Sequence, residues 1–321
     1  MINISDKLKN KINQIPELPG IYKMLDAKGN IIYIGKSKSI KKRVKTYFSN
    51  NPKWEKVKKM VLLIDDIEFE VTDTHLEAML LECELIKLIK PIFNSQMKND
   101  KRYIYLKIED YNKYNSLKIV NNREENSYGP FRRKFLIFEI IESLKNFYPI
   151  KKINNSYYFE YHLFPTSMDK ETFEENKSIL IELFSDVKNL SVFIESLEDK
   201  MNAESNLFNF EAASMYRDVV QNINYLKNII NRYTNMTAKN ILLKIPIQNG
   251  HKLFFISNGH IILKEKYLAL TYDEIDNFIK SGTILSASYL SNMDEKSHID
   301  FRDILYSEIM NFPEEMVTMN L

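Results

Sequence analysis

The chain has 321 residues, of which 44% are hydrophobic and 27% charged, proportions that are ordinary for a soluble globular protein. That length allows two or three compact units. It contains no run of eighteen apolar residues, and its N-terminus lacks the apolar segment of a signal peptide. We therefore expect a cytoplasmic protein without a membrane segment. The single cysteine, Cys83, excludes an internal disulfide, a multi-cysteine metal site and an iron–sulfur cluster.

The formal net charge is only +2, but the charges are unevenly distributed. Residues 36–59 hold ten lysines and arginines against one acid, whereas residues 160–205 hold eleven acids against four lysines. A basic segment of this kind fits a polyanion such as nucleic acid, and it equally fits a solvated helix face.

The first hundred residues predict a small α/β unit with a short antiparallel sheet. Two β-branched segments flank the turn at Lys28-Gly29-Asn30, which is typical of a β-hairpin. Ser39 stands where the N-cap of a basic helix is expected, and Thr74-x-x-Glu77 is a capping box that opens a later helix. The elements expected here are strands at 20–27, 30–36 and 67–73 and helices at 40–48, 53–64 and 75–90, the last ended by Pro91.

The remaining two thirds predict a helical region followed by strands. Residues 169–230 are helical in pattern, and a polar break at 206–209 divides them into an αα-hairpin. Asn249-Gly250 and Asn258-Gly259 are good hairpin turns between strands. The fold class predicted is α+β, with further strands at 103–110, 115–120, 241–247, 252–257 and 260–270, helices at 134–148 and 272–281, and a final strand-and-helix stretch.

Two tyrosines and several cations occur around the first hairpin. A tyrosine is a poor base at its free pKa of about 10, and a nearby cation lowers that pKa by stabilising the phenolate. Lys36 comes directly after YIG, while Arg43 and Tyr47 are four residues apart and share one helix face. Lysine and arginine together suit a phosphodiester whose charge grows during attack. Gly35 is expected to let the backbone approach a ligand closely.

Glu82 is the candidate metal ligand. In helix 75–90, Ala78, Leu81, Leu85 and Ile89 lie on one face, and Glu82 falls within that apolar arc. Glu77 and Glu84 are expected to point to solvent. A carboxylate directed at the core is costly unless it is paired or binds a cation. Two interpretations stay open, a Mg²⁺ or Mn²⁺ site with one ion and a structural ion pair with Lys36 or Arg43.

The joint order of these residues resembles the GIY-YIG endonuclease domain. It comprises GIY at 20–22, YIGK at 33–36, an arginine seven residues later, a tyrosine after four more, a glutamate on a later helix and Asn94. Within that superfamily, residues 16–108 are similar to the N-terminal domain of UvrC excision nucleases and their short Cho-type relatives. The resemblance implies a one-metal phosphodiesterase with no further small-molecule cofactor.

The resemblance also implies roles for seven residues. Tyr22 and Tyr33 match the two family tyrosines, one of which activates the attacking water. Lys36 and Arg43 match the residues that hold and neutralise the scissile phosphate, and Glu82 matches the metal-binding carboxylate. Supporting active-site positions correspond to Tyr47 and Asn94. The lysines expected to follow DNA phosphates are Lys38, Lys41, Lys42 and Lys45.

A second resemblance covers about thirty residues. NLFNFEAASMYRDVV, residues 206–220, resembles the UVR motif, the helical hairpin through which UvrC and UvrB associate. It implies UvrB as a partner, bound through Phe210, Glu211, Arg217 and Asp218. An ordinary antiparallel hairpin is the alternative.

The chain departs from full-length UvrC because no cysteine cluster precedes the UVR motif and the sequence ends before an RNase H-like nuclease and helix-hairpin-helix modules. We therefore expect one incision, on the 3′ side of a lesion in double-stranded damaged DNA, by a short Cho-like form or a fragment. The alternatives are a non-catalytic adaptor and a mobile-element or restriction nuclease. The domains expected are 15–108 (GIY-YIG), 109–168 (connecting α/β segment), 169–235 (helical, with the UVR motif at about 195–230) and 236–321 (β-rich α+β).

Overall fold

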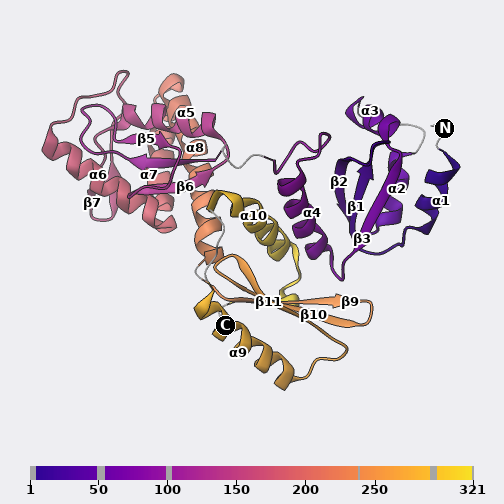
Figure 1. Cartoon of the computed structure of the whole chain (residues 1–321). Helices are drawn as coiled ribbons and strands as arrows, with labels where there is room; N and C mark the ends of the chain where they lie inside the picture. Colours follow the sequence, from indigo (N-terminus) through magenta and orange to yellow (C-terminus); the bar gives the residue numbers. More distant parts are fainter. Residues whose placement is uncertain (1–4, 49–54, 99–102, 238, 290–294, 320–321) are drawn as a thin grey trace. The chain divides into compact units, whose positions relative to one another are not determined.

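The computed structural model describes residues 5–48, 55–98, 103–237, 239–289 and 295–319, without the side chains of 233–237. The chain forms two compact units (Figure 1). The first combines Met1–Asp100 with Met236–Leu321, and the second is Lys101–Asn235. Both contain small antiparallel sheets and helices, so the fold is α+β as predicted. None of the described helices is long and apolar enough to span a bilayer.

The N-terminal part of the first unit is built on an antiparallel sheet with strand order β2-β1-β3. The predicted hairpin is present. Its turn is held by the Asp26 carboxylate, which accepts hydrogen bonds from the backbone N–H groups of Lys28 and Asn30, and Gly29 takes a φ of 78° there. The elements are α1 Asp6–Gln14, β1 Gly20–Leu25, β2 Ile31–Ser37, α2 Ile40–Tyr47, α3 Glu55–Leu63, β3 Asp66–Val71 and α4 His75–Ile89.

The helix starts of this part follow the sequence signals with one difference. The capping box of Thr74 and Glu77 opens α4 as predicted, and the helix ends just before Pro91. Ser39 occupies the N-cap position of α2, but its side chain makes no capping hydrogen bond. Instead the Ser37 hydroxyl donates to the Ser39 carbonyl and accepts from the Ser39 N–H, so a local turn replaces the cap.

The C-terminal part of the first unit is a second antiparallel sheet, of strand order β11-β10-β9-β12. Both predicted asparagine–glycine turns are present, and Gly250, Asn258 and Gly259 all have positive φ. A capping box of Thr271 and Glu274 opens α9, which is longer than predicted. The elements are β9 Ile241–Ile247, β10 Gly250–Ser257, β11 His260–Tyr267, α9 Tyr272–Ser288, α10 Glu295–Asn311, the 3₁₀ turn η3 Glu314–Met316 and β12 Val317–Met319.

Helix α4 is covered on two sides. One side packs on β1 and β2 of the N-terminal sheet, and the other lies beside α10 (Figure 1). Leu76 and Cys83 are buried in one hydrophobic cluster with residues of β9, β10 and α10. Lys87 also forms an ion pair of 2.8 Å with the buried Asp300 of α10. The sequence predicted only one buried face for this helix, so the C-terminal part adds a second.

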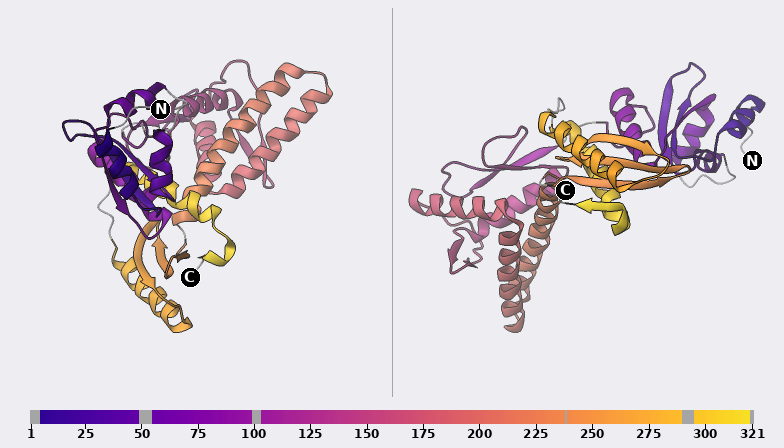
Figure 2. Two further views of the ribbon diagram at one scale, coloured as in Figure 1. Left: turned by 90° about the vertical axis from the view of Figure 1, so that its right-hand side faces the viewer. Right: turned by 90° about the horizontal axis from the view of Figure 1, so that it is seen from below.

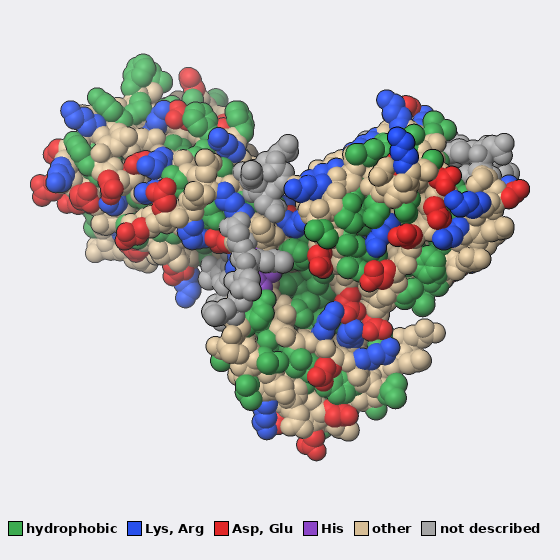
Figure 3. Space-filling model, in the orientation of Figure 1, with side chains coloured by type: hydrophobic (Ala, Val, Ile, Leu, Met, Phe, Trp, Pro, Cys, Tyr) green, Lys and Arg blue, Asp and Glu red, His purple; other side chains and the backbone are tan. Residues whose placement is uncertain are grey.

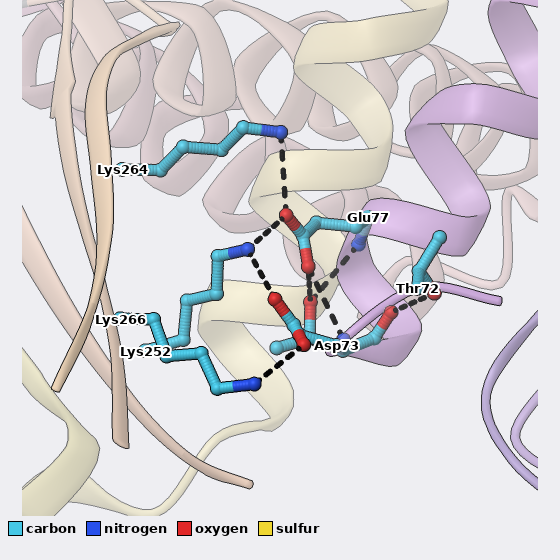
Figure 4. Close-up of polar contacts among 7 residues, drawn as sticks. Thr72, Asp73, Glu77, Lys252, Lys264 and Lys266 are labelled. Atoms are coloured by element: carbon cyan, nitrogen blue, oxygen red, sulfur yellow. Dashed lines mark hydrogen bonds and ion pairs between the residues drawn. The ribbon is translucent and has the colours of Figure 1, made fainter. Parts of the chain in front are cut away.

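The expectation that Glu77 points to solvent is wrong. Its side chain is only 10% exposed, because Lys252 of β10 and Lys264 of β11 lie 2.7 and 3.2 Å from its carboxylate. Asp73, just before α4, pairs with Lys252 and Lys266 at 2.7 and 3.1 Å. Figure 4 shows the three lysines reaching from the sheet toward the start of α4. Glu77 thus both caps α4 and ties it to the C-terminal sheet.

The second unit contains the predicted hairpin of β4 and β5 together with β6, a strand that the sequence did not predict. The helical region has two breaks. One is the predicted break between α7 and α8, and the other is at Asp186, which separates α6 from α7 and caps α7 by accepting from the Lys188 N–H. Figure 2 shows α7 and α8 as a long antiparallel pair. The elements are β4 Ile104–Ile108, β5 Leu117–Val120, β6 Ser127–Phe131, α5 Lys134–Leu144, the 3₁₀ turn η2 Lys145–Phe147, β7 Lys151–Ile153, β8 Ser156–Tyr158, α6 Lys170–Ser185, α7 Val187–Asn206 and α8 Phe210–Thr237.

Candidate active site

Three tyrosines meet where β1, β2 and the end of α2 come together. The ring centroids of Tyr22, Tyr33 and Tyr47 lie 5.9 to 6.2 Å from one another. The hydroxyls of Tyr22 and Tyr47 are 2.8 Å apart, and the Tyr47 hydroxyl donates to that of Tyr33 at 3.3 Å. Tyr22 is almost completely buried, whereas Tyr33 is half-buried and lines a cleft of about 310 Å³. Tyr33 is therefore the phenol at the cleft, at one end of a chain of three hydroxyls.

The pKa values of Tyr22 and Tyr33 shift in the direction opposite to the one expected from sequence. Burial raises the pKa of Tyr22 well above its ordinary value, and the neighbouring tyrosines raise it further. Burial also raises the pKa of Tyr33. The Arg43 charge lowers both pKa values, but it is the smallest of these effects. The cation therefore does not outweigh desolvation, and both phenols are protonated at neutral pH.

Gly35 makes room for a protein side chain. A Cβ at this position would lie 2.2 Å from the Tyr22 hydroxyl, closer than any real contact. The sequence predicted that Gly35 would let the backbone approach a ligand, and the group that approaches is Tyr22. The glycine therefore permits the buried hydroxyl pair to form under β2.

Glu82 and Lys36 come together at the edge of β2. The Lys36 backbone N–H donates to Glu82 Oε1 at 3.1 Å, and among the described residues Glu82 has neither an ion pair nor another hydrogen bond. Burial raises the pKa of Glu82 to about 7, although the charge of Lys36, this hydrogen bond and the charge of Arg43 act in the opposite direction. A cation at this carboxylate would offset the cost of its burial. The arrangement favours the cation site over the structural ion pair.

Among the residues that the structure describes, Glu82 does not belong to a cluster of candidate metal ligands. No group of three or more His, Cys, Asp or Glu side chains suited to a metal occurs in the described part of the chain. A single carboxylate leaves most of the coordination of a hard cation to water and substrate oxygens, as is common for Mg²⁺. The residues present fit a weakly held divalent ion that is completed by a phosphate.

His75 is a site residue that the sequence analysis missed. Its Nε2 lies 3.2 Å from Lys36 Nζ. Burial and the charges of Lys36 and Lys38 lower the pKa of His75 to about 4, so the ring is neutral at pH 7 and can accept a hydrogen bond from the ammonium group. The contact joins β2 to the first residue of α4, two elements far apart in sequence, and no local pattern indicates it.

Asn94 is fully engaged with β2. Its Oδ1 accepts from the Ile34 N–H at 3.0 Å and its Nδ2 donates to the Ile34 carbonyl at 2.9 Å. The amide therefore anchors the segment after α4 to the strand that carries Tyr33. The cleft is lined by Tyr33, Lys56, Glu82, Ile86, Phe93, Asn94, Ser95, Gln96 and Met97.

The expected DNA-binding cations divide into two groups. Lys41 donates to the Asn13 carbonyl and Lys42 lies 3.3 Å from Glu17. Lys38 and Lys45 are exposed and form no ion pair with another described residue. The Arg43 guanidinium lies 5.0 Å from the centre of the Tyr47 ring, which places its charge beside the tyrosine trio. On the face shown in Figure 3, lysine side chains also stand over α3.

The residues of the candidate partner site lie at the start of α8. Phe210 is 64% exposed and its ring packs edge-on against that of Phe208. Leu207 is also exposed, so the turn between α7 and α8 presents an apolar tip. Glu211, Arg217 and Asp218 are exposed as well, and Arg217 forms a 2.8 Å ion pair with Asp218.

Comparison with known proteins places this site in a family. Residues 18–95 match the family model described as a UvrC-like GIY-YIG domain, so this part of the first unit is a GIY-YIG domain. The match continues beyond the domain: UvrABC system protein C of Clostridium botulinum strain Hall is 29% identical over 334 residues, covering 94% of this chain and 53% of that protein. The chain is a UvrC-type GIY-YIG protein.

A further relative and a solved structure are similar to parts of this chain. UvrABC system protein C of Caldanaerobacter subterraneus is 33% identical over 231 residues, covering 66% of this chain and 37% of that protein. The crystal structure of the GIY-YIG N-terminal endonuclease domain of UvrC from Thermotoga maritima bound to magnesium is 38% identical. It covers 29% of this chain and 100% of its own, with a TM-score of 0.27. The chain spans about half the length of the curated Clostridium relatives.

Proposed function

We propose that the protein is a metal-dependent DNA endonuclease of nucleotide excision repair that makes one incision, on the 3′ side of a lesion, after recruitment by UvrB. The observation that carries this proposal is the cleft in which Tyr33 and Glu82 lie together, with Lys36 bound to Glu82 through its backbone. The relatives named UvrABC system protein C support the repair context.

The residues of the cleft would divide the work of hydrolysis. Glu82 would hold one Mg²⁺ or Mn²⁺ ion, which supplies Lewis-acid activation of the scissile phosphate. Lys36 Nζ and the Arg43 guanidinium would neutralise the charge that grows on the phosphate oxygens. The neutral His75 would keep the Lys36 ammonium group in place without reducing its charge.

Tyr33 is the phenol best placed to accept the proton of the attacking water, because it lines the cleft whereas Tyr22 is buried beneath it. Because burial raises the pKa of Tyr33, the step would use the minor phenolate form of Tyr33, whose oxygen gains one proton as the O–H bond of the water breaks. The Tyr47 hydroxyl donates to Tyr33 at 3.3 Å and lies 2.8 Å from the Tyr22 hydroxyl, contacts that hold the Tyr33 oxygen at the cleft. In this scheme Tyr22 and Tyr47 support Tyr33 rather than touch the substrate.

The exposed apolar tip of the α7–α8 hairpin favours recruitment by UvrB over an ordinary structural hairpin. An internal hairpin would be expected to bury Phe210, yet this ring and its neighbour Phe208 remain exposed. The adaptor alternative, in which the protein only binds partners, is not favoured because the tyrosine, lysine, arginine and glutamate set is complete.

The decisive experiment is incision of a duplex with a single lesion and labelled ends, in the presence of UvrA and UvrB. We expect one metal-dependent cut on the 3′ side of the lesion. Glu82→Gln should abolish it, while Glu84→Gln, an exposed change on the same helix, should not. Cutting that persists in EDTA or in the Glu82→Gln protein would refute the proposed chemistry, and a cut on the 5′ side would refute the proposed position.

A further inference from the structure

The cleft contains a cation that the proposed chemistry does not use. Lys56 of α3 lines the cleft together with Glu82, and its Nζ donates to Ser95 Oγ at 2.6 Å. Ser95 directly follows Asn94, which is anchored to β2. The hydrogen bond therefore holds the ammonium group of this exposed lysine beside Ser95, which lines the cleft.

A second lysine comes next in the segment whose residues 93–97 line the cleft. Lys98 follows Met97, the last residue that lines the cleft. Burial lowers the pKa of Lys98, and the charge of Lys56 lowers it further. Within the described ranges neither ammonium group has a carboxylate partner within 4 Å. An anion bound beside Lys56 would offset the repulsion between the charges of the two lysines.

These two lysines are separate from the groups assigned to the reacting phosphate. Lys36 and Arg43 belong to β2 and α2, whereas Lys56 and Lys98 belong to α3 and the segment after α4. Glu82 is the only acid among the lining residues, so the Lys56 wall is a basic region beside the metal-binding carboxylate. The Ser95 hydroxyl adds a donor, since it can rotate to bond an anion while it accepts from Lys56.

We propose that Lys56, Lys98 and the Ser95 hydroxyl form a subsite for a phosphate group of the DNA strand, next to the phosphate that is cut. This assignment rests on the proposed function, because it takes the cleft to be the one that holds DNA. The subsite sets the position of the strand relative to Glu82 and Tyr33. Loss of its charges should therefore weaken substrate binding more than it slows the chemical step.

The test compares Lys56→Ala/Lys98→Ala with Lys59→Ala, a matched change of an exposed lysine on α3 that does not line the cleft. We expect the double variant to raise KM about tenfold or more with kcat nearly unchanged. The slope of log affinity against log salt should fall by about 1.8, two contacts at 0.9 each. Lys56→Arg should retain most of the binding because it keeps the charge.

A second measurement locates the phosphate. The Glu82→Gln protein and its Lys56→Ala/Lys98→Ala derivative are titrated with duplexes that carry one neutral methylphosphonate at successive positions around the cut. We expect one position, next to the scissile phosphate, where the neutral linkage weakens binding to the Glu82→Gln protein but not to its derivative. The subsite would be overturned if the Lys56→Ala/Lys98→Ala protein had the KM and salt slope of Lys59→Ala. It would also be overturned if no methylphosphonate position showed this difference.

Two further outcomes are distinguished. Competition by inorganic phosphate that depends on Lys56, with no methylphosphonate effect, would identify a free phosphate ligand and overturn the assignment to DNA. If the wild-type protein neither cuts nor binds duplex under any condition, the proposed function fails. If the wild-type protein cuts and the Lys56→Ala/Lys98→Ala protein has the same KM and salt slope, only the subsite is refuted.

Discussion

Lys252 of β10 lies 2.7 Å from the carboxylate of Glu77 on α4, and both side chains are nearly buried, at 12% and 10% exposure. The pair joins the C-terminal sheet to the helix that carries Glu82, the candidate metal ligand. In this chain the position of Glu82 therefore depends on residues more than 150 positions later in the sequence.

Lys252→Ala should destabilise the first unit. Among the described residues, the change leaves Lys264 and Lys266, which are more exposed, as the ion-pair partners of Glu77 and Asp73. We therefore expect a loss of about 2 kcal/mol in the free energy of unfolding. Lys280→Ala, which breaks an exposed pair with Asp276 on α9, should cost less than about 0.5 kcal/mol. Urea denaturation followed by circular dichroism measures the loss of stability in both variants. Equal losses would show that the buried Lys252 pair stabilises the protein no more than an exposed pair does.

Tyr33→Phe should slow incision more than Tyr22→Phe. Removing the hydroxyl at the cleft should lower the rate by about 10²–10⁴-fold, the usual scale for loss of a general base. Tyr22→Phe removes a buried hydrogen bond to Tyr47, and we expect mainly a loss of about 1 kcal/mol in stability. Single-turnover rates together with unfolding curves separate the two effects. The reverse order of rates would transfer the proton-accepting role to Tyr22.

The stability of the metal-free protein should depend on pH through Glu82. The pKa of this carboxyl is raised from 4.5 to about 7 in the folded chain. Its contribution is therefore complete below pH 4.5 and is lost as the pH rises through 7, because the folded state then must hold a buried charge. In EDTA we expect about 3 kcal/mol of stability to be lost between pH 4.5 and 8 from this group alone.

Glu82→Gln should lack that loss, so the difference between the two proteins isolates the carboxyl from every other titrating group. Added Mg²⁺ should reduce the loss in the wild-type protein, since the ion binds the charged carboxylate. Parallel stability curves for the two proteins in EDTA would contradict the raised pKa of Glu82.

Phe210→Ala combined with Arg217→Ala should abolish capture of UvrB. Truncating a central aromatic residue in a small interface commonly costs more than about 2 kcal/mol, or thirtyfold in affinity. Because Phe210 and Arg217 are exposed, the helical content should not change. Phe138→Ala, an exposed phenylalanine of α5, is the matched control. Titration calorimetry with UvrB measures the effect, and full affinity in the double variant would exclude the hairpin as the docking site.

The sequence by itself determined the elements that depend on near neighbours. The first hairpin, the capping box at Thr74 and the two asparagine–glycine turns all follow from local backbone preferences and short-range hydrogen bonds. The position of Glu82 on the side of α4 next to β2 also follows from helical periodicity, but Ile89 of the predicted apolar arc is 37% exposed.

Only the tertiary structure decided what surrounds these residues. A periodic pattern shows which side of α4 is apolar. Whether α10 and β10 cover its other side depends on contacts with residues more than 150 positions later in the chain. The contact with Lys252 of β10 buries Glu77. The sequence likewise shows cations near the tyrosines, yet burial of Tyr22 and Tyr33 raises their pKa values because desolvation exceeds the attraction of Arg43. Local order sets the elements, whereas burial and charge proximity arise from packing between distant segments.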